Sequence, residues 1–315
     1  MPESAIVFTP TSDLNHQEWL KARKKGIGGS DVGAILGLNK WRSPIQVYMD
    51  KIGEAPAVPE NEAMYFGNIL EEVVAREFSK RTGKKVRNRN AILQHPDYPW
   101  MLANVDRLIV GEKVGLECKT ASEYMKDEWE GDEVPTSYLL QCQHYMAVTG
   151  YEAWWIAVLI GGNKFRYKKI ERDEEIIQML IEAEEEFWNA HVVPRIPPEI
   201  DGSEASEKLL KSMYPESEPD SETELPDEAD KLIEALEQVK TEIDEREALK
   251  KEYENKLKQM LGEFETGLAS NHVIRWKTYV SNRIDTKRLK AEQPDIYERY
   301  IKPSKSRRFT IKEAK

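Results

Sequence analysis

The hydrophobic and polar positions of residues 103–120 alternate in the way expected of a β-hairpin. Residues 108–110 form an apolar, partly β-branched run typical of a strand, and the Gly-Glu-Lys that follows is turn chemistry. The extended pattern resumes over residues 114–120. Because successive side chains of a strand point to opposite faces, we predict that Glu117 and Lys119 share one face of this hairpin.

Asp106 lies on the preceding strand and is predicted to come level with Glu117 across the hairpin. Carboxylate oxygens are the natural ligands of Mg²⁺, and a nearby lysine can orient or deprotonate a water or offset phosphoryl charge. The alternative is an exposed hairpin whose charged residues face solvent. Spacing alone favours that alternative, since Asp, Glu and Lys are common on solvated strand faces.

Helical and strand periodicities on both sides of this hairpin indicate an α/β fold. The sequence WWIAVLI at residues 154–160 is continuously apolar, as in the centre of a buried sheet. Residues 84–93 are predicted to form one strand with a basic face, which can line a DNA groove or protect a sheet edge. The helices predicted around these strands span residues 12–25, 63–81, 137–149 and 171–191.

The pattern changes after the last of these helices. Residues 201–226 are rich in Ser, Glu, Asp and Pro and are predicted to be an acidic linker. Residues 227–262 are strongly helical, with Leu232, Leu236, Val239 and Ile243 at the 4-3-4 spacing of a coiled-coil seam that is then interrupted. A helical hairpin, a helix docked on its own domain and an intermolecular coil all fit this pattern. Two short strands, one helix over residues 284–303 and a basic tail are predicted to follow.

The charge of the chain is unevenly distributed. The formal net charge of the 315 residues is −11, but residues 201–250 alone hold 17 Asp and Glu against 6 Lys and Arg. Residues 271–315 hold 13 Lys and Arg against 5 Asp and Glu. Because electrostatic attraction depends on local patches, the acidic total does not exclude DNA as a partner.

Composition also bears on the compartment. The two cysteines, Cys118 and Cys142, lie in apolar elements and are predicted to be buried thiols in a reducing compartment. No apolar run approaches the roughly 20 residues of a membrane span, and the N-terminal residues lack the pattern of a secretory signal. We therefore expect a soluble cytoplasmic protein with no membrane partner.

Several motifs occur together in a fixed order. Asp106 followed by Glu117-Cys118-Lys119 resembles the D…(D/E)-x-K core of the restriction-endonuclease-like, or PD-(D/E)XK, nucleases. Arg23 with the sequence GIGGSD, then GNILE ending at Glu71, then QCQHY beginning at Gln141, resemble in order the motifs of YqaJ-like viral recombinases, relatives of the lambda-type exonucleases. This ordered set is more specific than any single motif.

The resemblance implies a fold and a domain organisation. We expect a restriction-endonuclease-like α/β core with a central mixed β-sheet flanked by helices, plus a C-terminal helical and small β appendage. The expected divisions are an exonuclease domain over residues 1–200, the acidic linker over residues 201–226, and a helical and basic appendage over residues 227–315.

The resemblance also implies a metal centre that holds Mg²⁺, or Mn²⁺ in its place. Lys119 would position or activate the attacking water, and Gln141 would support it. The spacing G-x-x-x-E selects Glu71 over its neighbour Glu72 as the carboxylate that points inward. The implied metal ligands are Glu71, Asp106, Glu117 and the backbone carbonyl of Cys118.

Substrate contacts are implied in the same way. Arg23 and Ser30 match positions that hold a terminal 5′ phosphate in lambda-type enzymes, although the glycines before residue 32 also suit an ordinary connection between helices. Tyr145 stands four residues after Gln141 and therefore shares a helix face with it, where both can contact phosphate or pack against a neighbouring helix. Tyr145 is therefore predicted to be a substrate contact.

The implied activity is exonucleolytic, 5′-to-3′ hydrolysis of linear duplex DNA in phage-type recombination. The implied partners are double-stranded DNA ends, a single-strand annealing protein and further copies of the chain in a ring trimer or tetramer. An endonuclease or nickase of the same superfamily is one alternative. A DNA-binding recombination module without catalysis is another, against which the intact Asp106, Glu117 and Lys119 argue.

Overall fold

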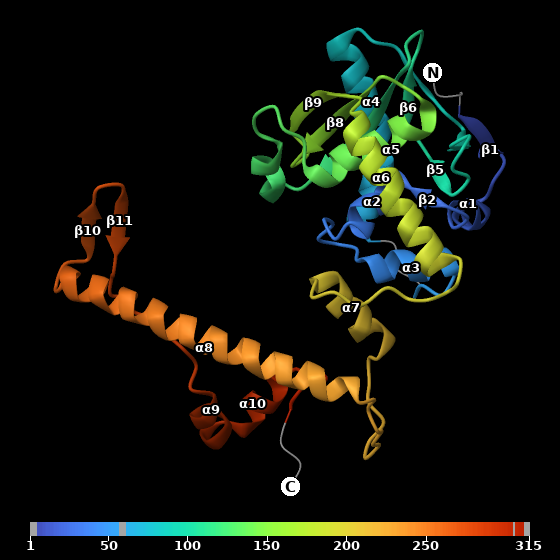
Figure 1. Ribbon diagram of the computed structural model, residues 1–315. Coiled ribbons are helices and arrows are strands. Elements are labelled where there is room, and N and C mark those ends of the chain that lie inside the picture. Colours follow the sequence, from blue (N-terminus) through green and yellow to red (C-terminus); the bar gives the residue numbers. More distant parts are fainter. Residues whose placement is uncertain (1–4, 57–60, 305, 312–315) are drawn as a thin grey trace. The chain divides into compact units, whose positions relative to one another are not determined.

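The computed structural model describes residues 5–56, 61–304 and 306–311 of the chain. These residues form two compact units, which comprise residues 1–214 and residues 215–315 (Figure 1). The predicted linker over residues 201–226 contains a helix, α7 (Glu204–Met213), which belongs to the first unit. The division of the chain into functional domains stays a prediction.

A five-stranded mixed sheet forms the centre of the first unit. Its strands run in the order β3-β6-β7-β8-β9, and β7 and β8 are parallel neighbours while the other pairs are antiparallel. This mixed sheet flanked by helices confirms the predicted fold class. The strand bounds are Val86–Asn88 (β3), Arg107–Ile109 (β6), Val114–Ala121 (β7), Ala153–Ile160 (β8) and Lys164–Glu171 (β9).

A second, four-stranded sheet has the order β1-β4-β5-β2. Its β4 begins at Ala91, so the single basic strand predicted over residues 84–93 is wrong. The exposed, basic half of that segment pairs with β6 as β3, and the buried, apolar half pairs with β1 and β5 as β4. The strand bounds are Ile6–Pro10 (β1), Ile27–Gly28 (β2), Ala91–Gln94 (β4) and Met101–Ala103 (β5).

Helices surround these sheets and are capped by local sequence. The side chain of Asn61 accepts the backbone N–H of Met64 at 2.9 Å at the start of α4, and the left-handed Gly83 ends that helix. The remaining helices of the first unit are α1 (His16–Arg23), α2 (Gly29–Ile35), α3 (Pro44–Ile52), α4 (Glu62–Thr82), a 3-10 helix (Glu123–Trp129), α5 (Thr136–Thr149), α6 (Glu174–Phe187) and a π-helical turn (Trp188–Val192).

The central strands are covered on both faces, as the apolar run of β8 predicts. Phe78 of α4 belongs to one buried cluster with Leu116 and Cys118 of β7. Met146 of α5 belongs to another with Ile156 of β8. Because Glu117 alternates with Leu116 and Cys118 along β7, its side chain lies on the α5 side of the sheet. Cys118 and Cys142 are both buried free thiols, as predicted.

The second unit is built on one long helix, α8 (Glu228–Leu261), followed by a hairpin (Figure 1). The hairpin pairs β10 (Thr266–Ala269) with β11 (His272–Arg275), which confirms the two predicted strands. The helix predicted over residues 284–303 is instead two helices, α9 (Thr286–Glu292) and α10 (Pro294–Tyr300), because Pro294 has no N–H to continue α9. No helix in the described part of the chain is long and apolar enough to cross a membrane.

Candidate active site

The hairpin of β6 and β7 brings Asp106 beside Glu117. Arg107 at the start of β6 pairs with Leu116 of β7, so Asp106 stands level with the next residue of β7. Asp106 Oδ2 accepts the backbone N–H of Cys118 at 2.8 Å. Glu117 is only 3% exposed, so the alternative of a solvated hairpin is wrong.

Lys119 and Gln141 both contact one oxygen of Glu117. Lys119 Nζ lies 2.6 Å from Glu117 Oε1, and Gln141 Nε2 donates to the same oxygen at 2.7 Å. Gln141 comes from α5, which packs over this face of the sheet. The other oxygen, Glu117 Oε2, is buried and has no hydrogen-bond partner among the described residues. A buried carboxylate oxygen without a donor is costly, which marks it as a ligand position.

The charges of this cluster do not balance. Burial, and then the charge of Glu117, raise the pKa of Asp106 to about 8. Burial alone would lower the pKa of Lys119, but the carboxylates of Glu117 and Asp106 outweigh burial and raise it. Lys119 is therefore an ammonium at neutral pH, which suits positioning and charge stabilisation better than the deprotonation of water considered from the sequence.

Glu71 has a different partner from the one predicted. The guanidinium of Arg107 forms an ion pair with Glu71, and its Nη2 lies 3.1 Å from Glu72 Oε2. Burial, and then the charge of Asp106, raise the pKa of Glu71. Within the described ranges, no group of three or more His, Cys, Asp or Glu side chains is arranged to hold a metal ion. In this structure Asp106 lies beside Glu117, and Arg107 holds the carboxylate of Glu71.

The pair nevertheless offers the donors that a hard divalent cation requires. Two carboxylates, one of them with the unpartnered oxygen of Glu117, are oxygen ligands of the kind that Mg²⁺ and Mn²⁺ bind. Burial raises the pKa of the Cys118 thiol, which therefore stays protonated and is a poor metal ligand. The backbone carbonyl oxygen of Cys118 remains as a ligand. Glu71 can join this donor set only by exchanging its ion pair with Arg107. Its role as a ligand stays a prediction.

The predicted substrate contacts fall into two places. Arg23 Nη2 donates to Ser30 Oγ at 3.2 Å, and the same guanidinium lies 4.6 Å from the ring centre of Trp19. Tyr145, in contrast, is 4% exposed, and its hydroxyl accepts a hydrogen bond from Gln141 Nε2 at 2.8 Å. Tyr145 is therefore in the core, where it orients Gln141. Its role as a substrate contact stays a prediction.

The glycine-rich segment serves close packing between helices. A Cβ at Gly29 would lie 2.7 Å from Tyr145 Cε1, so only glycine lets α2 approach α5 at this point. This contact places the start of α2, with Ser30, against the helix that carries Gln141. The glycines thus fit the alternative of an ordinary connection between helices. Arg23 and Ser30 nevertheless lie together beside this connection.

A second buried carboxylate was missed by the sequence reasoning. Asp31 is 1% exposed, and it accepts the backbone N–H of Gly28 at 2.9 Å. Lys51 Nζ lies 2.6 Å from Asp31 Oδ2, and Arg42 forms an ion pair with Asp31 Oδ1. The sequence signal was the Asp of the GGSD motif, but its cations come from α3 and from the loop before it. We call Asp31, Arg42 and Lys51 the Asp31 cluster.

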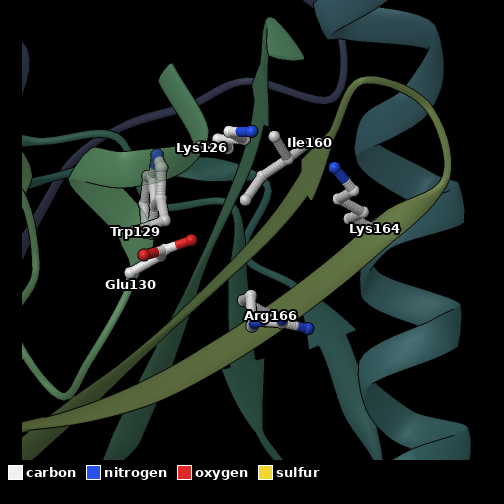
Figure 2. Close-up of a pocket in the computed structure, with 6 residues that line it drawn as sticks. All are labelled: Lys126, Trp129, Glu130, Ile160, Lys164 and Arg166. Atoms are coloured by element: carbon white, nitrogen blue, oxygen red, sulfur yellow. The ribbon is translucent and has the colours of Figure 1, made fainter. Parts of the chain in front are cut away.

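A pocket of about 170 Å³ lies apart from these carboxylates (Figure 2). Its Trp129 stacks on Tyr138 with ring centres 5.5 Å apart, and Lys119 Nζ lies 5.1 Å from the ring centre of Tyr138. An aromatic pair thus connects this pocket with the Lys119 ammonium. The pocket is lined by Lys126, Trp129, Glu130, Ile160, Lys164 and Arg166.

Comparisons with known proteins found several similar chains. The protein YqaJ of Bacillus subtilis (strain 168) is 49% identical over 312 residues, which cover 98% of both chains. A crystal structure of the alkaline exonuclease LHK-Exo from Laribacter hongkongensis is 20% identical over 55% of this chain and 91% of that one, with a TM-score of 0.48. A second structure of LHK-Exo, in complex with dAMP, is 21% identical over 62% of this chain and 97% of that one, with a TM-score of 0.49.

The family model for the YqaJ-like viral recombinase domain matches residues 18–152. This match contains Arg23 and Ser30 together with the carboxylate pair and Gln141. The assignment of the chain to a family rests on this match and on the similarity to YqaJ of Bacillus subtilis, which covers 98% of both chains. The chain belongs to the YqaJ-like viral recombinase family.

Proposed function

We propose that this protein is a metal-dependent deoxyribonuclease that hydrolyses the phosphodiester bonds of linear duplex DNA from its ends, in the 5′-to-3′ direction. The observation that carries the proposal is the pair of the half-buried Asp106 and the buried Glu117, with Lys119 beside it and Glu117 Oε2 without a hydrogen-bond partner among the described residues. The resemblance of the motifs to lambda-type exonucleases and the recombinase family of the chain support it.

Each residue has a defined task in this proposal. Asp106 and Glu117 would hold Mg²⁺, or Mn²⁺, with the carbonyl of Cys118. When bound there, the ion would supply polarisation of a phosphate oxygen and a lowered pKa for a coordinated water. The ammonium of Lys119 orients the attacking water as a donor and offsets the charge that develops on the phosphoryl group. Gln141 fixes the Glu117 carboxylate, and Tyr145 fixes Gln141.

Arg23 and Ser30 supply the contact with the DNA end. A guanidinium and a hydroxyl, held together at 3.2 Å, can both donate to a terminal 5′ phosphate. We expect a duplex with 5′-phosphate ends to be digested faster than the same duplex with 5′-hydroxyl ends. The Arg23→Gln variant should remove this difference. Equal digestion of both ends by the unaltered protein would contradict the assignment of this pair.

The assembly proposed for this activity is a ring of three or four copies that acts beside a single-strand annealing protein. The support for it is the resemblance to ring-forming lambda-type enzymes. Sedimentation equilibrium of the purified chain measures its mass directly. A monomer at micromolar concentration, with and without DNA, would reject the ring.

Digestion of linear duplex DNA with Mg²⁺, and again with excess EDTA, tests the proposed activity. We expect degradation only with the metal, and a loss of about 10²–10³-fold in rate for Lys119→Ala, because one preorganised charge at a reacting phosphate is worth this much. Lys113→Ala, in the exposed turn of the same hairpin, is the matched control and should keep the wild-type rate.

The same assay separates the other candidate functions. Cleavage of closed circular DNA as fast as linear DNA would indicate an endonuclease or nickase. Binding of linear DNA without any hydrolysis in Mg²⁺ or Mn²⁺ would indicate a recombination module without catalysis. Wild-type hydrolysis by Lys119→Ala would reject the role given to this lysine.

A further inference from the structure

The second unit carries opposite charges on its two parts. Its long helix α8 continues the acidic stretch, while residues 271–315 hold 13 Lys and Arg against 5 Asp and Glu. The cations therefore follow the hairpin of β10 and β11 in sequence and are concentrated in the last part of the chain. A local excess of this size is the electrostatic footprint of a polyanion partner.

Two aromatic side chains are exposed just after this hairpin. The backbone N–H of Trp276 donates to Glu265 O at 2.9 Å, which fixes the base of the hairpin. The Trp276 side chain is 51% exposed, and that of Tyr279, three residues on, is 82% exposed. Large aromatic surfaces left in water are candidate binding surfaces, because their burial is strongly favourable.

Cations flank these rings. Arg275 and Arg283 are exposed, and neither forms an ion pair within the part of the chain that the structure describes. Lys277, between the rings, lies 3.3 Å from Glu265 in an exposed pair, which contributes little stability and exchanges readily. Guanidinium groups without a carboxylate partner are available to phosphate, which they bind bidentately. We call Arg275, Trp276, Lys277, Tyr279 and Arg283 the Trp276 platform.

We propose that the Trp276 platform binds single-stranded DNA, with bases stacked on Trp276 and Tyr279 and phosphates on Arg275 and Arg283. In a duplex the faces of the bases are covered by their neighbours, whereas a single strand can offer them to an aromatic ring. Alternating rings and cations are the arrangement that binds single strands with little sequence preference. The alternative occupant, a protein, would find few carboxylates here with which its own cations could pair.

Fluorescence anisotropy with the full chain in EDTA tests the proposal. The probe is a labelled oligothymidylate of about 15 nucleotides, a length near the upper site size of single-strand binding folds. We expect the double variant Trp276→Ala/Tyr279→Ala to bind at least about tenfold more weakly, because stacking of each base contributes about 1–3 kcal/mol. Tyr253→Ala, which removes a 55% exposed ring from the long helix α8, is the matched control and should bind as the wild type does.

Three further readouts complete the test. Arg275→Gln/Arg283→Gln should lower the slope of affinity against salt by about 1.4, since each phosphate contact on a single strand contributes about 0.7. Circular dichroism and the thermal midpoint must be unchanged in all variants. The initial rate on linear duplex DNA should also be unchanged, so that failure of this proposal is distinguishable from failure of the proposed nuclease activity.

Wild-type affinity of the aromatic variant for the oligonucleotide would overturn the proposal and leave the surface to a protein partner. An equal loss of affinity for oligonucleotide and for a duplex of the same length would also overturn it, because it would show attraction by charge without stacking.

Discussion

Two aspartates in the first unit, the buried Asp31 and the half-buried Asp106, have opposite electrostatics. Burial disfavours the ionised form of Asp31, but Lys51 and then Arg42 outweigh burial and hold its pKa far below the ordinary value of 3.8. Removal from water also disfavours the ionised form of Asp106, and the neighbouring carboxylate of Glu117 adds to this effect, so that its pKa rises to about 8. The pKa values of the two aspartates thus shift in opposite directions because their nearest charged neighbours have opposite signs.

The difference separates a structural site from a chemical one. The Asp31 cluster pairs its carboxylate with two cations and the backbone N–H of Gly28. It ties α2 to α3 and so holds the segment that carries Ser30. At Asp106 the carboxylates exceed their cations, and Glu117 Oε2 has no hydrogen-bond donor among the residues that the structure describes. Such an excess of negative charge costs stability and a single substitution could remove it, so a fold that keeps it marks a candidate functional site.

Among single substitutions at neutral pH, the largest expected effect on stability follows from breaking the balanced cluster. Asp31→Ala leaves the ammonium of Lys51 buried without its partner and should lower the free energy of unfolding by about 3–5 kcal/mol. Urea unfolding, followed by circular dichroism, measures this. The double variant Asp31→Ala/Lys51→Met should recover part of the loss. If Asp106→Asn proved equally destabilising, the contrast between the two clusters would fail.

The next effect concerns binding of metal by the unbalanced pair. Glu117→Gln removes one negative ligand and should weaken Mn²⁺ binding at least about tenfold, the loss seen when even the supports of metal ligands are altered. Calorimetric titration with Mn²⁺ measures the affinity, and Glu112→Gln, an exposed residue of the same hairpin, is the control. Unchanged affinity in Glu117→Gln would show that the ion binds elsewhere.

The two aspartates also predict opposite dependences of stability on pH. The folded-state pKa of Asp106 is raised, so the contribution of its protonated form to the free energy of unfolding is complete below pH 3.8 and is lost as the pH rises through about 8. The contribution of Asp31 is present above pH 3.8 and is lost as the pH falls through its lowered pKa. In EDTA, Asp106 should therefore reduce the free energy of unfolding by up to about 1.4 kcal/mol per pH unit between these two values.

Urea unfolding of the wild type and of Asp106→Asn over this pH range isolates the contribution of Asp106 to the pH dependence of stability. The variant should show a flatter profile. Parallel profiles for the two proteins would mean that Asp106 titrates normally and that its carboxylate is not crowded by Glu117.

The smallest expected effect tests the support of Glu117. Tyr145→Phe removes the hydroxyl that accepts from Gln141, an interaction of about 1 kcal/mol, and should slow DNA hydrolysis several-fold with no change in metal affinity. Single-turnover rates measure it. A loss as large as that of Lys119→Ala would instead place the tyrosine hydroxyl in contact with the substrate.

The local patterns of the sequence predicted the parts of this site that a single element determines. Strand alternation gave the common face of Glu117 and Lys119, and helical spacing gave the α5 face that carries Gln141. The hairpin register followed from one short turn. These predictions succeed because each depends on residues close together in the chain.

The remaining features depend on contacts between distant elements. Arg107 binds Glu71 across 36 positions of sequence, and nothing local to either residue indicates this pair. The sequence predicted the helix face that carries Tyr145, but it did not indicate that α2 approaches this residue through Gly29. The single strand predicted over residues 84–93 divides between two sheets for the same reason, since each half follows its own distant partners.

The rate at which Asp106→Asn hydrolyses a linear, 5′-phosphorylated duplex in Mg²⁺ tests the central claim most directly. We expect a loss of at least about 10²-fold relative to the wild type, the scale of one lost electrostatic contribution at a reacting centre, in a variant whose stability is equal or higher. A rate equal to that of the wild type, in a variant that is correctly folded, would contradict the assignment of the chemistry to the pair of Asp106 and Glu117.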